Sequence, residues 1–80
     1  MGLSAREWLA RYAADLGTAA PTDAEVEELL ALAGVAAHAS ERTAAPVACW
    51  LAARAGWPPS EALAVAKRAA EVLAEDGAGG

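Results

Sequence analysis

Alanine dominates this chain and constrains what it can fold into. Of the 80 residues 25 are alanine, against nine leucines, five valines, no isoleucine and no phenylalanine. Alanine is the best helix former because its side chain loses no rotamer entropy on folding, but it buries little apolar area. The composition therefore predicts helices that form readily and enclose a small core. A small domain with such a small core can bury further apolar surface against a partner or a second copy, so we expect it to associate.

Local signals divide the chain into helical segments. Ser4–Glu7 and Thr22–Glu25 have the spacing of capping boxes, which begin helices. Gly17 and Gly56 suit helix ends, and Pro46 suits the first turn of a new helix. No stretch alternates with the period-two pattern of a strand. The sequence predicts helices over about residues 5–16, 23–42, 45–55 and 59–75, followed by a flexible tail at 76–80.

These segments predict an all-α fold, a single compact domain over residues 1–80 built as a bundle of about four helices. The segment from Leu29 to Ala39 is apolar nearly all round, which is typical of a central helix, and we expect it to form the centre with the 45–55 helix. Gly34 within it is expected to mark a close helix crossing. The expected inner face of the last helix consists of Ala62, Val65, Ala66, Ala69, Val72 and Leu73.

The formal charge of −5 limits the classes of partner. Nucleic-acid recognition and anionic membrane surfaces both require a basic face, so we expect neither partner. No apolar run approaches the roughly 18 to 20 residues that span a bilayer. The amino-terminal residues lack the pattern of a signal peptide, and a single cysteine cannot form an internal disulfide. We therefore expect a soluble, cytoplasmic domain.

Three polar residues gather at the bend between the second and third predicted helices. His38 lies near a helix carboxyl end, where the dipole favours its cationic form. It is interpreted either as a histidine bonded to a neighbouring carboxylate or carbonyl, or as a ligand contact. Glu41 falls on the same face as His38 if the helix continues. Arg42 either closes the bend or binds a carboxylate or phosphate in fork geometry, and Thr43 is a candidate cap for the next helix.

The remaining candidates suggest packing and contact rather than catalysis. Cys49 lies in an apolar helix and is interpreted as a small buried hydrophobe. Trp57 precedes two prolines in a turn, which makes it a candidate interface anchor. One histidine and one cysteine do not make a metal set. No nucleophile with a positioned base and no glycine-rich phosphate loop is present, so we expect no enzyme, no catalytic residue, no metal and no cofactor.

The central stretch resembles a known family. An apolar helix ending in Ala37-His38 is followed by Glu41-Arg42, by Ala44-Ala45-Pro46 and by a second apolar helix that closes on Gly56. This pattern is similar to that of a small bacterial helical domain of unassigned function. That domain occurs alone or fused behind the nucleotidyltransferase domain of molybdenum cofactor guanylyltransferases. The resemblance implies association with molybdenum cofactor maturation or molybdoenzyme assembly, and it implies no catalytic residue.

Three hypotheses about function follow. The first is a non-catalytic interaction module that presents His38, Glu41, Arg42 and Trp57 to a protein partner, such as a molybdenum cofactor nucleotidyltransferase or a molybdoenzyme. The second is a small-molecule binder in which His38 and Arg42 hold an anionic nucleotide or pterin. The third is a structural homodimer without a ligand, suggested by the alanine-rich core.

Overall fold

Four helices and their connecting loops make up the described part of the chain. The computed structural model describes the backbone of residue 2 and residues 4–79, and the side chains of residue 2 and residues 4–74. The helices are α1 (Ala5–Leu16), α2 (Asp23–Ala39), α3 (Ala44–Ala55) and α4 (Pro59–Gly79), and no strand occurs in this range. The predicted all-α class with about four helices is confirmed.

The helix boundaries that depend on local capping agree with the prediction. The Oγ atom of Ser4 accepts the N–H of Glu7 at 3.1 Å. At the start of α2 the capping box is reciprocal, because Thr22 Oγ1 accepts the N–H of Glu25 at 3.1 Å and Glu25 Oε1 accepts the N–H of Thr22 at 2.8 Å. Gly17 and Gly56 take left-handed φ values of 81° and 78° as they end α1 and α3.

Two predicted helix ends and one predicted helix cap are wrong. The second helix ends at Ala39 rather than near residue 42, since the Ser40 hydroxyl donates to the carbonyl of Ala36 at 3.0 Å and its backbone leaves the helical region. Thr43 does not cap α3, because its backbone is already helical and its hydroxyl donates to Glu41 Oε2 instead. Helix α4 runs to Gly79, so the predicted tail is helical as far as residue 79. Residue 80 lies outside the described residues.

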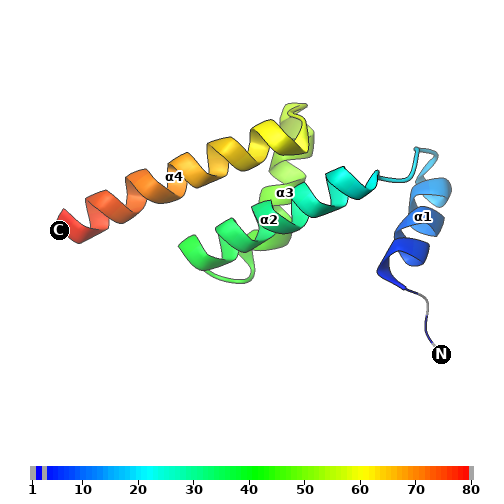
Figure 1. Cartoon of the computed structure of the whole chain (residues 1–80), viewed down its shortest axis with the longest axis horizontal. Coiled ribbons are helices and arrows are strands. Elements are labelled where there is room, and N and C mark those ends of the chain that lie inside the picture. The colour runs from blue at the N-terminus through cyan, green and yellow to red at the C-terminus, as the bar shows by residue number, and fades with distance from the viewer. Residues whose placement is uncertain (1, 3, 80) are drawn as a thin grey trace.

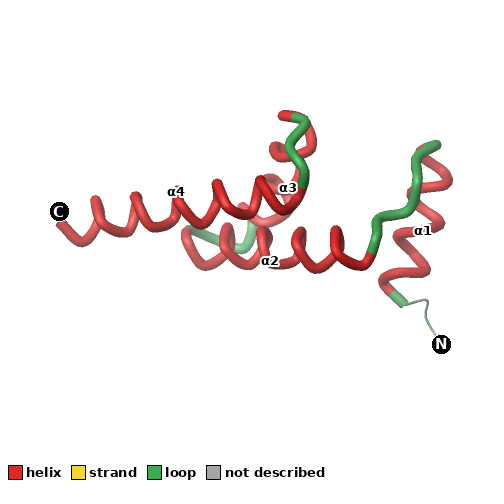
Figure 2. Tube along the Cα trace, turned by 45° about the horizontal axis from the view of Figure 1, so that its top comes forward, coloured by secondary structure: helices red, strands yellow, loops and turns green. Residues whose placement is uncertain are grey.

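The second helix is the centre of the arrangement. It packs against both α3 and α4, and α4 runs alongside it in both ribbon views (Figures 1 and 2). The first helix stands apart at the amino-terminal end, where Arg6 forms an ion pair with Asp23. The molecule is elongated, with extents of 47 × 30 × 18 Å. The expectation that the third helix shares the centre is wrong, because α3 carries no buried residue.

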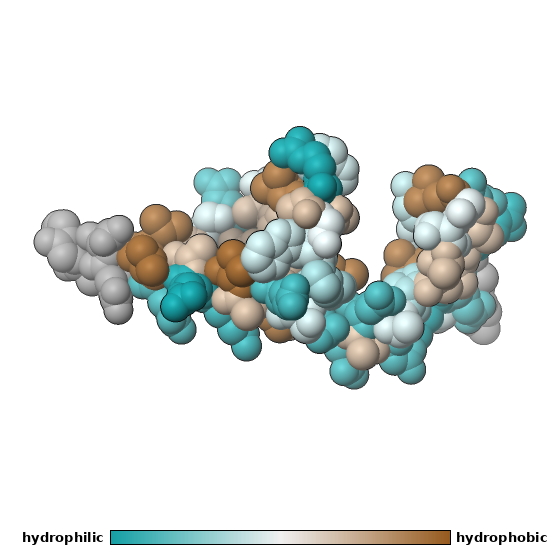
Figure 3. Space-filling model, turned by 90° about the horizontal axis from the view of Figure 1, so that it is seen from above, coloured by the Kyte–Doolittle hydropathy of each residue, from teal (hydrophilic) through white to brown (hydrophobic). Residues whose placement is uncertain are grey.

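The core is small, as the alanine content predicts. Among the described residues only Ala13, Leu32 and Ala62 are buried. Of the expected inner face of α4, Ala62 alone is buried, since α2 covers a single side of that helix. Gly34 marks no close crossing, because a Cβ atom built there would have no neighbour within 4 Å. Large apolar side chains therefore remain exposed on all four helices within the described residues, and a notch separates α1 from the other helices (Figure 3).

Within the described range, none of the helices combines the length and the apolar character that a membrane crossing requires.

Candidate functional site

The polar residues predicted at the bend are exposed and only loosely grouped. His38 lies in the last turn of α2, whereas Glu41 and Arg42 lie in the turn that follows. Because α2 ends before Glu41, the expected shared helical face of His38 and Glu41 does not form. The backbone of this turn is closed by bonds from the N–H of Ala44 to the Glu41 carbonyl and from the N–H of Ala45 to the Arg42 carbonyl. Among the described side chains, no hydrogen bond or ion pair joins His38, Glu41 and Arg42.

His38 faces α4 rather than the turn. It borders a shallow, open depression of about 430 Å³ between the carboxyl-terminal half of α2 and the middle of α4. Lys67 and Glu71 supply its charged rim, and the rest of its lining is apolar: Val35, Ala39, Ala70 and Ala74. The depression carries one basic and one acidic side chain beside the imidazole, so its local charge does not select for an anion.

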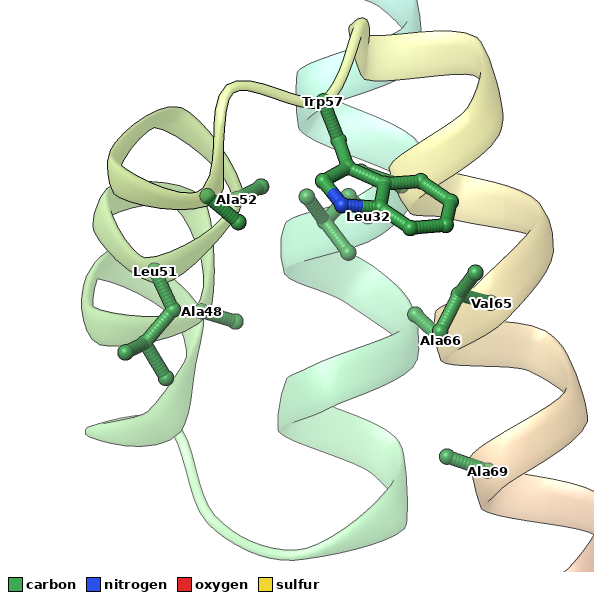
Figure 4. A pocket seen from close by; sticks show the side chains of 10 residues that line it. Leu32, Ala48, Leu51, Ala52, Trp57, Val65, Ala66 and Ala69 are labelled. Carbon is green, nitrogen blue, oxygen red and sulfur yellow. The ribbon is translucent and has the colours of Figure 1, made fainter.

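A second surface feature is better formed and almost wholly apolar. A groove of about 270 Å³ runs between α3 and α4, with buried Leu32 of α2 at its floor (Figure 4). Leu51 of α3 and Val65 of α4 stand on its two walls, and the Trp57 indole lies across one end. The other residues that line it are all alanine: Ala48, Ala52, Ala55, Ala62, Ala66 and Ala69. This groove is the candidate functional site.

The turn between α3 and α4 places Trp57 over the groove. The left-handed Gly56 reverses the chain so that the N–H of Trp57 donates to the carbonyl of Ala52 at 3.1 Å. This is the Schellman arrangement, in which the residue after the glycine turns back toward the last turn of the helix. The α4 helix then starts at Pro59, and the carbonyl of Pro58 accepts the N–H of Ala62 at 2.9 Å. Because both anchors are backbone bonds, the position of Trp57 is fixed by the turn.

Alanine is the reason that the groove exists. Six of its lining residues are alanines, whose methyl groups let α3 and α4 pack on Leu32 without filling the space between them. The larger side chains stay half exposed at its edges, with 46% of Leu51, 50% of Trp57 and 51% of Val65 accessible to solvent. The indole N–H of Trp57 is the sole polar side-chain group among the lining residues. Such a surface recognises shape and apolar area rather than charge.

Cys49 does not line the groove and contacts α2. Its Sγ atom is 3.8 Å from the carbonyl oxygen of Leu29, to which the thiol donates. Burial raises the pKa of the Cys49 thiol, because the charged thiolate is poorly solvated there. The neutral thiol suits the predicted packing role. Within the described residues, no three histidine, cysteine or acidic side chains come together as a metal site would require.

Of the four predicted site residues, the structure places only Trp57 in the groove. The sequence analysis missed its other members, and it assigned Val65 and Ala69 to an inner face that would be covered. A signal was present in the composition. A core built from alanine cannot cover leucine and valine side chains on every helix face, so some of them must remain accessible.

These features define a class of protein, a small all-α domain that exposes an apolar groove. Residues 3–79 match the family described as "Domain of unknown function (DUF6457)", and the chain belongs to this family. The match confirms the predicted resemblance to a helical domain of unassigned function. It carries no link to molybdenum cofactor guanylyltransferases. No curated protein and no solved structure matches the chain.

Proposed function

We propose that this domain is a non-catalytic interaction module that binds an apolar, helical protein surface in the groove between α3 and α4. The observation that carries the proposal is the groove itself, in which Leu51, Trp57 and Val65 stand half exposed around a floor of buried Leu32. Exposed apolar surface of this kind is costly to leave in water and marks interaction sites. Trp57 is the expected anchor, since tryptophan is enriched among residues that dominate binding energy.

A helix is the partner element that such a groove suits best. Two helices separated by small side chains leave a channel into which a third helix can place residues spaced at i, i+3, i+4 and i+7. Helix α3 has 12 residues and is about 18 Å long at 1.5 Å per residue, and the groove lies along it from Ala48 to Ala55. Trp57 lies at one end of α3, and the turn that carries Glu41 and Arg42 lies at the other. A helix of about three turns can therefore contact both ends.

The polar residues of the bend serve in this proposal as a rim. His38, Glu41 and Arg42 are exposed, and charged groups at the edge of an interface govern association rate and orientation more than affinity. The alternative in which His38 and Arg42 hold an anionic nucleotide or pterin needs both side chains to converge. No contact in the structure brings them together, so we give the interaction module preference.

The resemblance to domains fused to molybdenum cofactor guanylyltransferases supplies the first partner to test. The purified domain is titrated with such a nucleotidyltransferase, and binding is measured by calorimetry. We expect a complex that Val65→Asp abolishes, because the substitution places a charge in the groove. The matched control is Ala64→Asp, which adds the same charge on the neighbouring, exposed residue.

A second experiment identifies protein partners other than the nucleotidyltransferase. Two variants each carry one photoreactive residue, either in place of Leu51 in the groove or in place of Glu27, which is exposed on α2. Each variant is irradiated in host cells, and the proteins cross-linked to it are identified. A defined protein that cross-links from position 51 alone, and whose purified form binds wild type but not Val65→Asp, supports the proposal. Equal cross-linking from both positions, or none from either, overturns it.

A further inference from the structure

The accessible surface of the chain is larger than a closed monomer of its mass would have. The surface measures 6079 Å² for a mass of 8.0 kDa. Folded monomers of that mass expose about 4,500 Å², so the excess is about 1,600 Å² per chain. A standard interface buries about 800 Å² on each partner, and obligate homodimers bury more. The excess is therefore of the size that a stable dimer removes from water.

The apolar surface of the groove continues along α4. Val65 and Ala69 line the groove and also border a shallow apolar area of the same helix that includes Val72 and Leu73. Half of Val72 and two-thirds of Leu73 are accessible. This apolar strip therefore continues from Trp57, in the turn before α4, to Leu73 on α4. The same helix thus forms a wall of the groove and carries an exposed apolar strip beyond it.

Two charged residues flank this strip. Glu61 and Arg68 are exposed and lie seven residues apart on α4, so they project from nearly the same side of the helix. Within the described part of the chain the ion pairs join Arg6 to Asp23 and Arg11 to Asp15, so these two charges on α4 are not engaged. Arg68 also borders the apolar area near Leu73.

We propose that the occupant of the groove is a second copy of this chain, with the two α4 helices packed antiparallel about a two-fold axis at Val65. This inference rests on the proposed interaction function and names its partner. Leu73 lies eight residues after Val65 on α4, so the axis brings Leu73 of the second copy toward the end of the groove at which Trp57 lies, in the turn before α4. Glu61 lies four residues before Val65 and Arg68 three after it. In the antiparallel arrangement, the levels of Glu61 and of Arg68 of the second copy therefore differ by one residue along the helix axis, or about 1.5 Å, so the two side chains lie opposite one another.

This register pairs the apolar strip and the two charged residues of α4 with complementary groups on the second copy. It uses one patch on both chains, as a two-fold interface requires. It covers the groove and the apolar strip of α4 together, and it forms two symmetric ion pairs from Glu61 and Arg68, which have no ion-pair partner in the described part of the chain. The alanines at positions 62, 66 and 69 permit the close approach of the second helix.

The experiment measures the molar mass of the whole chain by sedimentation equilibrium over a range of concentrations. We expect a reversible dimer for the wild type. Val65→Asp places two like charges at the axis, and we expect it to raise the dimer dissociation constant by about a hundredfold or more. Ala64→Asp is the matched control and should leave the dimer intact. Circular dichroism of each variant establishes that its helices have formed.

A charge reversal tests the register without disturbing the apolar surface. Glu61→Arg and Arg68→Glu each place like charges opposite one another, and each should weaken the dimer severalfold. The double variant Glu61→Arg/Arg68→Glu restores both pairs and should recover most of the wild-type affinity. A dimer that survives Val65→Asp, or a double variant no better than the single ones, overturns the proposed arrangement.

The outcomes separate this inference from the proposed function. If the wild type is a monomer at every concentration while position 51 still cross-links a different protein, the second copy is excluded and the interaction module stands. If the wild type is a monomer and position 51 cross-links nothing, both are overturned. A dimer that requires Val65 and shows charge-reversal rescue supports both.

Discussion

Leu30 and Leu32 lie two residues apart on α2 and have opposite environments. Only 3% of Leu32 is accessible, whereas 67% of Leu30 is. A difference of two residues turns a side chain by about 200° around a helix, which moves it from the face covered by α3 and α4 to the face that neither helix covers. Leu32 is the largest of the buried residues and forms the floor of the groove.

Replacing each leucine by alanine should therefore separate core from surface. We expect Leu32→Ala to lower the free energy of unfolding by about 2–5 kcal/mol, through lost burial and the cavity that remains. Leu30→Ala should change it by about 0.5 kcal/mol or less, as is usual for surface positions. Urea denaturation followed by circular dichroism measures both. Similar losses for the two variants would show that the exposed face of α2 is covered in solution.

Gly34 offers a stabilising substitution. It lies inside α2, and a methyl group there would meet no other atom within 4 Å. Gly34→Ala should raise the free energy of unfolding by up to about 1 kcal/mol, because glycine is the poorer helix former by that amount. The control is Gly56→Ala, which should lower stability by about 1–2 kcal/mol because φ is 78° there. Thermal denaturation tests both, and a loss of stability in Gly34→Ala would contradict the open surface at this position.

The two threonines that precede helices should respond differently to truncation. Thr22 caps α2 through a reciprocal capping box, so Thr22→Ala should cost about 1 kcal/mol. Thr43 precedes α3 without a capping hydrogen bond, so Thr43→Ala should have little effect on stability. The free energies of unfolding of Thr22→Ala, Thr43→Ala and the wild type are compared by urea denaturation. Equal losses would mean that Thr43 caps α3 in solution.

Cys49 should be unreactive near neutral pH and should make stability depend on alkaline pH. Its pKa is raised by burial, so the folded chain holds the thiol proton more tightly than the unfolded chain does. The stabilising contribution is complete below the unfolded pKa, and it is lost as the pH rises through the raised folded pKa. Alkylation by iodoacetamide at neutral pH should therefore be slower for the folded chain than for the chain unfolded in urea. Cys49→Ala provides the control for the alkaline loss of stability, which should be smaller in that variant.

The sequence by itself determined the helices. The cap residues Ser4 and Thr22 and the terminal glycines at 17 and 56 act within a few residues of their own position, so their effects could be predicted without any knowledge of packing. The prediction was wrong where a local bond competed with the helix, as at Ser40, and where the glycines beyond residue 75 did not end the helix. The alanine content also predicted the small core, because it limits the apolar area that any packing can bury.

Only the tertiary structure decided which helix faces are covered. The pattern of α4 marks one apolar side but does not say whether a neighbour of the same chain covers it, and Val65 and Val72 were assigned to the core for that reason. The crossing of α2 with α3 and α4 leaves that side open and makes it continuous with Trp57, which the turn at Gly56 places at the end of the groove. Residues from three helices form this surface, and the distances between them depend on packing over the whole chain. Local sequence cannot specify such a relationship.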